Sequence, residues 1–227
     1  MVMATERRDR RAALKDDNTA AERHRKPAEE GAAASQNILG WCYESGKGVP
    51  KEYERATMWY RKAAEQGSAE AQFNLGRCYY HGRGIAKDRA AAARWWRRSA
   101  EQGTAEAQFN LGCCYHVGDG VPVDDVRAAE WIIKAAEQGH AEAQYDLGRS
   151  YCHARGVPQD FTLAARYCLR AAEQGHADAQ YNVGLCYSSG VGVEQDDDAA
   201  GEWFRMAAEQ GHVEALNSLG SCYYDEP

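Results

Sequence analysis

The fold is decided by a stretch that recurs along the chain. Residues 69–104 read AEAQFNLGRCYYHGRGIAKDRAAAARWWRRSAEQGT. The start of this stretch returns as AQFNLG at 107–112, AQYDLG at 143–148 and AQYNVG at 179–184. Its end returns as AAEQG, and one glycine of the period recurs at Gly40, Gly76, Gly112, Gly148, Gly184 and Gly220. A constant period of 36 residues indicates a repeat protein built from one supersecondary unit.

The period divides the chain into domains without an insertion or deletion. Five full units span residues 33–68, 69–104, 105–140, 141–176 and 177–212. Residues 213–227 match the first half of a sixth unit. Residues 14–31 resemble the second half of a preceding unit, in which Arg23 and His24 stand where Trp59 and Tyr60 would be; such polar replacements suit an N-terminal cap helix. Residues 1–13 are expected to form a disordered tail.

Each unit has the pattern of two helices. In the first half, Ala71, Leu75 and Tyr79 lie four residues apart on one helical face. Paired glycines then end this helix. The second half repeats an apolar stripe with spacing i, i+3, i+4, i+7, preceded by a helix-capping aspartate at Asp88, Asp124, Asp160 and Asp196. The sequence therefore predicts an all-α solenoid of antiparallel helix pairs.

Composition and charge exclude several classes of protein. The 227 residues include six Trp and thirteen Tyr, which argues against disorder of the whole chain. No stretch approaches 18 apolar residues, so no membrane span is expected, and the N-terminus lacks the apolar segment of a secretory signal. A net charge of -7 argues against general nucleic-acid binding. The arginines that flank Trp95 and Trp96 are interpreted as a solvated outer face.

The unit closely resembles the Sel-1-like repeat, a relative of the tetratricopeptide repeat. The resemblance covers residues 33–227 and, weakly, 15–31, and it rests on the pattern AEAQFNLGxCYxxGxGVxxDxxxAxxWxxKAAEQG. It implies a right-handed superhelix that serves as an adaptor or scaffold in protein–protein interaction. The alternatives are a regulatory array or fragment of a larger enzyme complex, and a hydrolase-like cysteine-rich relative.

The cysteines indicate a reducing compartment. Five of the eight occupy one unit position: Cys42, Cys78, Cys114, Cys186 and Cys222. Equivalent positions of neighbouring units lie on helices about 8–10 Å apart, whereas a disulfide needs Cα atoms about 4.4–6.8 Å apart. Secreted cysteine-rich relatives pair cysteines within a unit at a short spacing that this chain lacks. We therefore predict reduced thiols and a cytoplasmic location, with the nucleus as the alternative.

No motif in the chain predicts catalysis, a cofactor or a metal site. No Ser-x-x-Lys occurs, which disfavours the hydrolase-like alternative. His140, His176 and His212 are one repeat apart, too far for one ion, and are interpreted as helix-capping contacts. Cysteine and histidine ligand types meet on two first helices, at Cys113, His116, Cys152 and His153, but without a zinc-binding spacing.

The resemblance to tetratricopeptide solenoids implies that first helices line a concave binding surface. The candidate residues are Trp41, Glu70, Phe73, Arg77, Tyr80, His81, Phe109, Cys113, His116, Tyr145, Arg149, Cys152, His153, Tyr181, Leu185 and Tyr224. We expect a protein or peptide ligand with acidic residues near Arg77 and Arg149. The alternative for Phe73, Phe109, Tyr145 and Tyr181 is that these rings mainly pack between first helices.

Charge is unevenly distributed along the repeats. Residues 33–104 hold twelve Lys and Arg against seven Asp and Glu, whereas residues 177–227 hold one against ten. The two ends of the array thus carry opposite charge, and each end has a half repeat. Self-association of the chain through these ends is therefore a second possible interaction.

Overall fold

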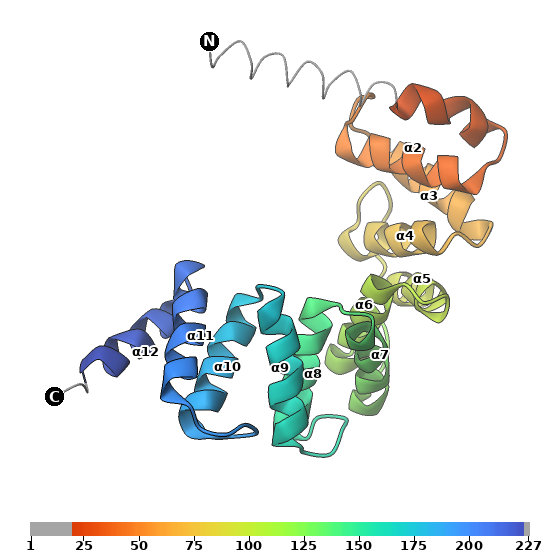
Figure 1. Cartoon of the computed structure of the whole chain (residues 1–227). Helices are drawn as coiled ribbons and strands as arrows, with labels where there is room; N and C mark the ends of the chain where they lie inside the picture. The colour runs from red at the N-terminus through yellow and green to blue at the C-terminus, as the bar shows by residue number, and fades with distance from the viewer. Residues whose placement is uncertain (1–19, 225–227) are drawn as a thin grey trace, which may run out of the picture. The chain divides into compact units, whose positions relative to one another are not determined.

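The computed structural model describes residues 20–224, with side chains through residue 219 (Figure 1). The tail predicted at 1–13 and the side chain of Tyr224 lie outside this description. Residues 20–29 are helical. The helices that follow are α2 (Ala33–Ser45), α3 (Tyr53–Glu65), α4 (Ala69–His81), α5 (Arg89–Glu101), α6 (Ala105–Val117), α7 (Asp125–Glu137), α8 (Ala141–His153), α9 (Phe161–Glu173), α10 (Ala177–Ser189), α11 (Asp197–Glu209) and α12 (Val213–Tyr224).

The described chain is an all-α solenoid, as the sequence predicts, and it forms two compact units. Unit 1 comprises residues up to Ala107 together with Asp119–Val121, and unit 2 comprises Gln108–Gly118 and the residues from Pro122 onward. In unit 1, α2 packs on α3, α3 on α4 and α4 on α5. In unit 2, each helix from α7 to α12 packs on the next (Figure 1). We refer to α2, α4, α6, α8 and α10 as first helices and to their successors as second helices.

The predicted caps of the second helices are confirmed. The side chains of Asp88, Asp124, Asp160 and Asp196 each accept a hydrogen bond from the backbone N–H three residues later, at 2.8–3.0 Å. Five first helices end at a residue with left-handed backbone. That residue is glycine at Gly46, Gly82, Gly118 and Gly190, and it is Ala154, with φ 55°, at the end of α8.

Histidine caps the later first helices, which confirms the capping interpretation. Nδ1 of His140, His176 and His212 accepts from the backbone N–H three residues later, at 3.2–3.3 Å. A neutral imidazole that accepts at Nδ1 carries its hydrogen on Nε2. In His176, which caps α10, this Nε2 lies 3.2 Å from Glu142 Oε2 on α8, the first helix before it. The capping side chain thus also joins neighbouring repeats.

In most helix pairs the core combines small residues with a large side chain that lies over the glycine of the first helix. Glycine on the first helix lets that large side chain approach closely: a Cβ added to Gly76 would lie 2.5 Å from the Trp96 ring, and one added to Gly184 would lie 2.6 Å from the Phe204 ring. Both rings are buried. The glycine of the AQxxLG motif is therefore a packing requirement as well as a marker of the period.

A buried glutamine network links the helices and explains the fixed glutamines of the motif. In unit 2, Gln144 donates to the Ala136 carbonyl at 3.1 Å and accepts from Gln174 at 2.7 Å. Gln72 makes the same two contacts in unit 1, with Ala64 and Gln102. Each network adds a side-chain donor to a carbonyl at the end of a second helix, which also accepts from the backbone N–H of Gly67 or Gly139 in the turn that follows.

Candidate functional site

The strongest candidate site lies in unit 2, where five of the predicted residues line one pocket. The pocket has a volume of about 580 Å³ and opens between α8, α9 and α10. The predicted residues on its wall are Tyr145, Arg149, Cys152, His153 and Leu185. The other lining residues include Phe161, Ala164, Cys168, Cys186 and Val191. We call this cavity the thiol pocket, because three cysteines contribute to its wall.

Two thiols of this pocket, those of Cys168 and Cys186, are protonated at neutral pH. Cys152, Cys168 and Cys186 are free. Burial, reinforced by the other two cysteines, raises the pKa of the Cys168 thiol to about 12, and burial also raises the pKa of Cys186. A thiol is a nucleophile only as its thiolate, so Cys168 and Cys186 contribute apolar surface at neutral pH.

A second, smaller pocket shares Arg149 with the first. It has a volume of about 240 Å³, and its lining includes His116 together with the charged residues Asp125, Asp146, Arg149 and Arg155. His116 Nδ1 lies 2.6 Å from Asp125 Oδ1, and Arg155 approaches His116 Nε2 at 2.8 Å. Because the arginine donates, Nε2 is the acceptor and Nδ1–H donates to the carboxylate. We call this cavity the charged pocket.

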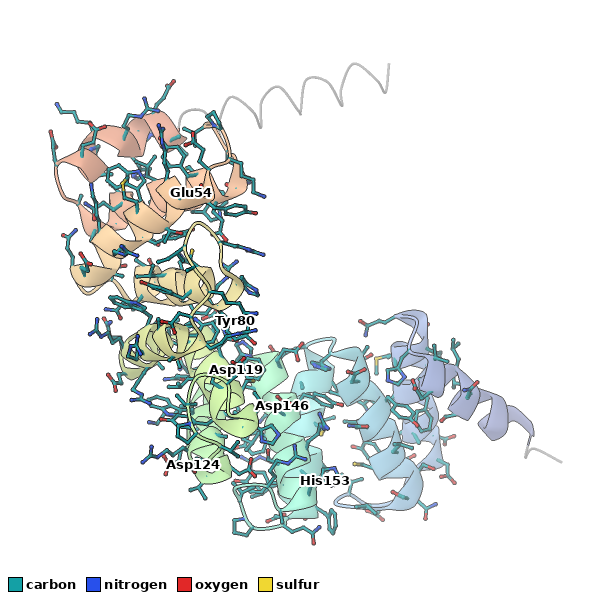
Figure 2. The ribbon with its side chains drawn as sticks, turned by 180° about the vertical axis from the view of Figure 1, so that it is seen from behind. Glu54, Tyr80, Asp119, Asp124, Asp146 and His153 are labelled. Carbon is teal, nitrogen blue, oxygen red and sulfur yellow. The ribbon has the colours of Figure 1, made fainter. Side chains whose placement is uncertain are left out.

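Arg149 stands between the two pockets with a weak internal partner. Its guanidinium lies 3.8 Å from Asp146 Oδ1, and half of its side chain is exposed. Burial raises the pKa of the Asp146 carboxyl, and the charge of Arg149 opposes that rise. Figure 2 shows Asp146 and His153 at separate points along α8. An exposed guanidinium in a loose ion pair remains able to bind a second carboxylate.

The predicted aromatic residues of α6, α8 and α10 also pack between repeats. The rings of Phe109, Tyr145 and Tyr181 lie 4.5–4.8 Å, centroid to centroid, from the histidine that caps the next first helix. All three remain partly exposed. This contact supports the alternative weighed for these rings, while their exposed edges still face solvent.

The predicted residues of unit 1 are engaged in internal contacts. Arg77 and Arg83 lie 3.4 and 3.3 Å from Glu44 Oε1, and Tyr60 donates to Glu44 Oε2 at 2.7 Å. Glu44 therefore already supplies Arg77 with a carboxylate. Phe73 lies near Arg77, and Glu70 accepts from Asn37.

Tyr80 and its neighbours form another packed group in unit 1. The Tyr80 ring packs on Trp96 at 5.0 Å and on His81 at 5.1 Å. The Arg89 guanidinium carbon lies 3.4 Å from the centroid of Tyr80, and Arg89 pairs with Asp119 at 3.1 Å; Figure 2 marks Tyr80 and Asp119. Trp41, in contrast, is 43% exposed. The structure thus fills this part of unit 1 with its own side chains.

Several residues of the two pockets escape sequence reasoning. Asp125, Arg155 and Phe161 come from second helices or connecting loops, which the concave-surface argument does not consider. A signal for the thiol pocket is present in the sequence: the register position of Cys168 is held by larger residues in the other four units, Tyr60, Trp96, Ile132 and Phe204.

Some kinds of site find no support within residues 20–224. In this part of the chain, no group of three or more His, Cys, Asp or Glu side chains is arranged to hold a metal ion. Cys113 is partly buried, and burial raises its pKa to about 12. None of the described helices combines the length and apolar character needed to cross a membrane.

Comparison with known proteins gives consistent matches. The family model described as Sel1 repeat matches residues 33–68, 69–104, 105–140, 141–176 and 177–212. A protective antigen of uropathogenic Escherichia coli with an SLR fold is 38% identical, with a TM-score of 0.85; the match covers 87% of this chain and 42% of that protein. A Sel1 repeat protein from Oxalobacter formigenes is 39% identical, with a TM-score of 0.76, over 84% of this chain and 76% of that one. No match was found among curated proteins.

Proposed function

This chain belongs to the Sel1 repeat family, and we propose that it is a non-catalytic adaptor that binds another protein through the first helices of its repeats. Proteins of this family are commonly scaffolds for protein–protein interaction. The chain spans less than half of the Escherichia coli protein that it resembles. The proposal therefore concerns the binding role of this array of repeats.

The observation that carries the proposal is the thiol pocket with Arg149 at its edge. Leu185 and Phe161 on its wall are 42% and 43% exposed, so they present apolar surface beside the cavity. Apolar surface next to an exposed arginine is the combination from which protein-binding hot spots are built. The neutral thiols of Cys168 and Cys186 support binding rather than catalysis.

The partner that fits this surface is a protein segment with an acidic residue. Among the described residues that line the thiol pocket, the charged or titratable nitrogen groups are Arg149 and His153, and none is acidic. An incoming carboxylate would therefore meet Arg149 without an acidic group on the wall of this pocket, although Asp146 lies 3.8 Å from Arg149 on the side of the charged pocket. Free thiols at this surface fit a reducing compartment, and we propose a cytoplasmic location for the complex.

The test is affinity capture from native lysate with the full chain and with Arg149→Glu. The matched control is Arg205→Glu: Arg205 also pairs with an acid three residues away at 3.8 Å and is similarly exposed, but it lies on second helix α11. We expect one set of partners to be retained by the wild type and the Arg205 variant and lost by the Arg149 variant.

Equal capture by all three proteins would overturn the assignment of the binding surface to Arg149. Turnover of a substrate by the purified chain, dependent on one side chain, would overturn the non-catalytic role. Arg77→Glu is a less direct probe, because it also removes an internal contact with Glu44.

A further inference from the structure

The thiol pocket lies where two equivalent positions of the repeat both carry a small side chain. This combination occurs in the repeat 141–176. The first position lies on the second helix, over the glycine of the first helix. In four repeats this position holds a larger residue: Tyr60, Trp96, Ile132 or Phe204. Side-chain atoms of each lie 2.5–2.8 Å from the place that a Cβ on the first-helix glycine would take. In the repeat 141–176 the same position holds Cys168, which covers Gly148 with a single sulfur atom.

The second position lies on the first helix and faces the first position. In unit 1 the two are filled together: the Tyr80 ring packs on Trp96, and Tyr60 donates to Glu44. In unit 2, His116 and Ile132 both line the charged pocket of about 240 Å³. In the repeat 141–176 both positions are cysteine, Cys152 and Cys168, and the pocket there measures about 580 Å³. The larger pocket thus lies where the side chains at both positions are small.

The size and the lining of the thiol pocket suit the binding of an aromatic ring. Ligand pockets commonly measure about 300–1,000 Å³, so the thiol pocket is large enough to accept an aromatic side chain. Its wall is apolar, with Ala164, Leu185 and Val191 beside the thiols. Tyr145 lines the thiol pocket, and two contacts fix its position: its hydroxyl accepts from Asn182 at 3.4 Å, and its ring packs on His176.

The charged residue at the mouth of the thiol pocket favours an acidic residue next to the bound ring. Arg149 is half exposed, and its contact with Asp146 at 3.8 Å is longer than a direct hydrogen bond. His153, also exposed, lines the same mouth. A carboxylate next to the ring would meet these groups.

We propose that the thiol pocket receives an aromatic side chain of a bound peptide, and that a neighbouring carboxylate of the same peptide pairs with Arg149. The inference rests on the proposed adaptor function and names the chemistry of its ligand. The peptide ring would occupy the volume that Trp96 and Phe204 fill from within the chain in other repeats. The repeat 141–176 is therefore the one in which the partner completes the packing.

The test uses the full chain and the peptide acetyl-Ser-Asp-Phe-Asp-Ser-amide, titrated by heteronuclear NMR. We expect amide shifts confined to α8, α9 and α10. Replacing the peptide's phenylalanine by alanine, or both of its aspartates by asparagine, should weaken binding at least about tenfold, since the first removes the anchor and the second removes the carboxylates.

Two substitutions in the chain fill the pocket from within. Cys168→Phe copies the residue of the repeat 177–212, and Cys152→Tyr copies that of the repeat 69–104 at a more exposed position. Each should reduce peptide affinity at least about tenfold without lowering the unfolding midpoint. Arg205→Gln, on α11 and outside the lining of the pocket, is the control; its affinity should stay within about threefold of wild type. The Cys152 variant keeps the test valid should the buried substitution prevent folding.

The outcomes separate this inference from the broader function. Equal binding of the alanine peptide, or unchanged affinity in both filled variants, would overturn the aromatic anchor. Binding of 3-phenylpropionate without binding of the peptide would assign the pocket to a small aromatic acid instead, and would also overturn the proposal. Partners that are captured by the Cys168→Phe chain but lost by Arg149→Glu would leave the adaptor function standing while the anchor fails.

Discussion

The ring of His176 packs on the ring of Tyr145, with 4.5 Å between their centroids. The same imidazole accepts the backbone N–H of Ala179 at 3.3 Å and lies 3.2 Å from Glu142. One side chain therefore starts α10 and ties it to α8. His212 repeats the arrangement with Tyr181 and Asp178. In a solenoid, where stability is a sum of neighbour contacts, such a residue acts at a repeat boundary.

Replacing His176 should separate its two roles. His176→Ala removes both the cap and the ring contact and is expected to cost about 2 kcal/mol of unfolding free energy. His176→Asn keeps a capping acceptor and loses the ring contact and the contact with Glu142, so it should cost about half as much. Urea unfolding followed by circular dichroism measures both. Equal losses in the two variants would mean that the cap contributes little here.

Two glycines of the repeat 177–212 should respond in opposite directions. A Cβ at Gly184 would meet the Phe204 ring at 2.6 Å, so Gly184→Ala is expected to destabilise by about 1–3 kcal/mol. Gly201 lies within α11 with open space around its Cβ position, so Gly201→Ala should stabilise by about 0.5–1 kcal/mol. Urea unfolding midpoints check both, and destabilisation by the Gly201 change would contradict the packing derived for this face.

The C-terminus of α8 carries a correctable strain. Ala154 adopts φ 55°, where the equivalent residue Gly190 adopts φ 68° at no steric cost. Ala154→Gly should therefore stabilise the chain by about 0.5–1 kcal/mol, after allowance for the greater freedom of glycine in the unfolded chain. The reciprocal change Gly190→Ala should destabilise it by a similar amount. Thermal unfolding of the two variants gives the comparison; shifts of the same sign would count against the strain.

The titration of Asp146 should report its burial and the charge of Arg149. Burial raises the folded-state pKa of this carboxyl above 3.8, so the stability that it contributes is full below that pH and is lost as pH rises through the folded-state pKa. The unfolding free energy of Asp146→Asn, relative to wild type, should accordingly increase as pH rises from about 4 to about 7.

Arg149→Gln gives the matching check by carboxyl-carbon NMR. Because the guanidinium opposes the rise in the pKa of Asp146, removing it should move that pKa further upward. The matched variant Arg205→Gln should leave the pKa of Asp146 unchanged. A downward movement in the Arg149 variant would show that the two side chains do not interact as the 3.8 Å contact indicates.

The sequence predicts most of the local structure, because each local signal acts within a few residues. The aspartate caps and the glycine ends follow from hydrogen bonds and backbone angles inside one turn, and the structure confirms them at Asp160 and Gly190. The capping role of His140, His176 and His212 is confirmed for the same reason. Ala154 departs from the glycine rule, yet its backbone is left-handed as well.

The candidate site is predicted only in part. First-helix residues such as Arg149 and Leu185 are found, because a helical face can be projected from sequence. The internal partner of Arg77 is missed, because Glu44 is 33 residues away and approaches only when neighbouring repeats stack. The contribution of Phe161 is missed for a similar reason, since the start of a second helix reaches the wall of a pocket formed by first helices.

The sequence by itself determined the repeat, the helices and their caps, because a 36-residue period and its turn signals are properties of short segments of chain. Only the tertiary structure decided which side chains are available to a partner. Arg77 pairs with Glu44, and Cys152 and Cys168 together leave a pocket open. Both results depend on side chains that come into contact from helices distant in sequence. Whether a side chain is available to a partner therefore depends on contacts between helices, and it cannot be predicted from the sequence of a single helix.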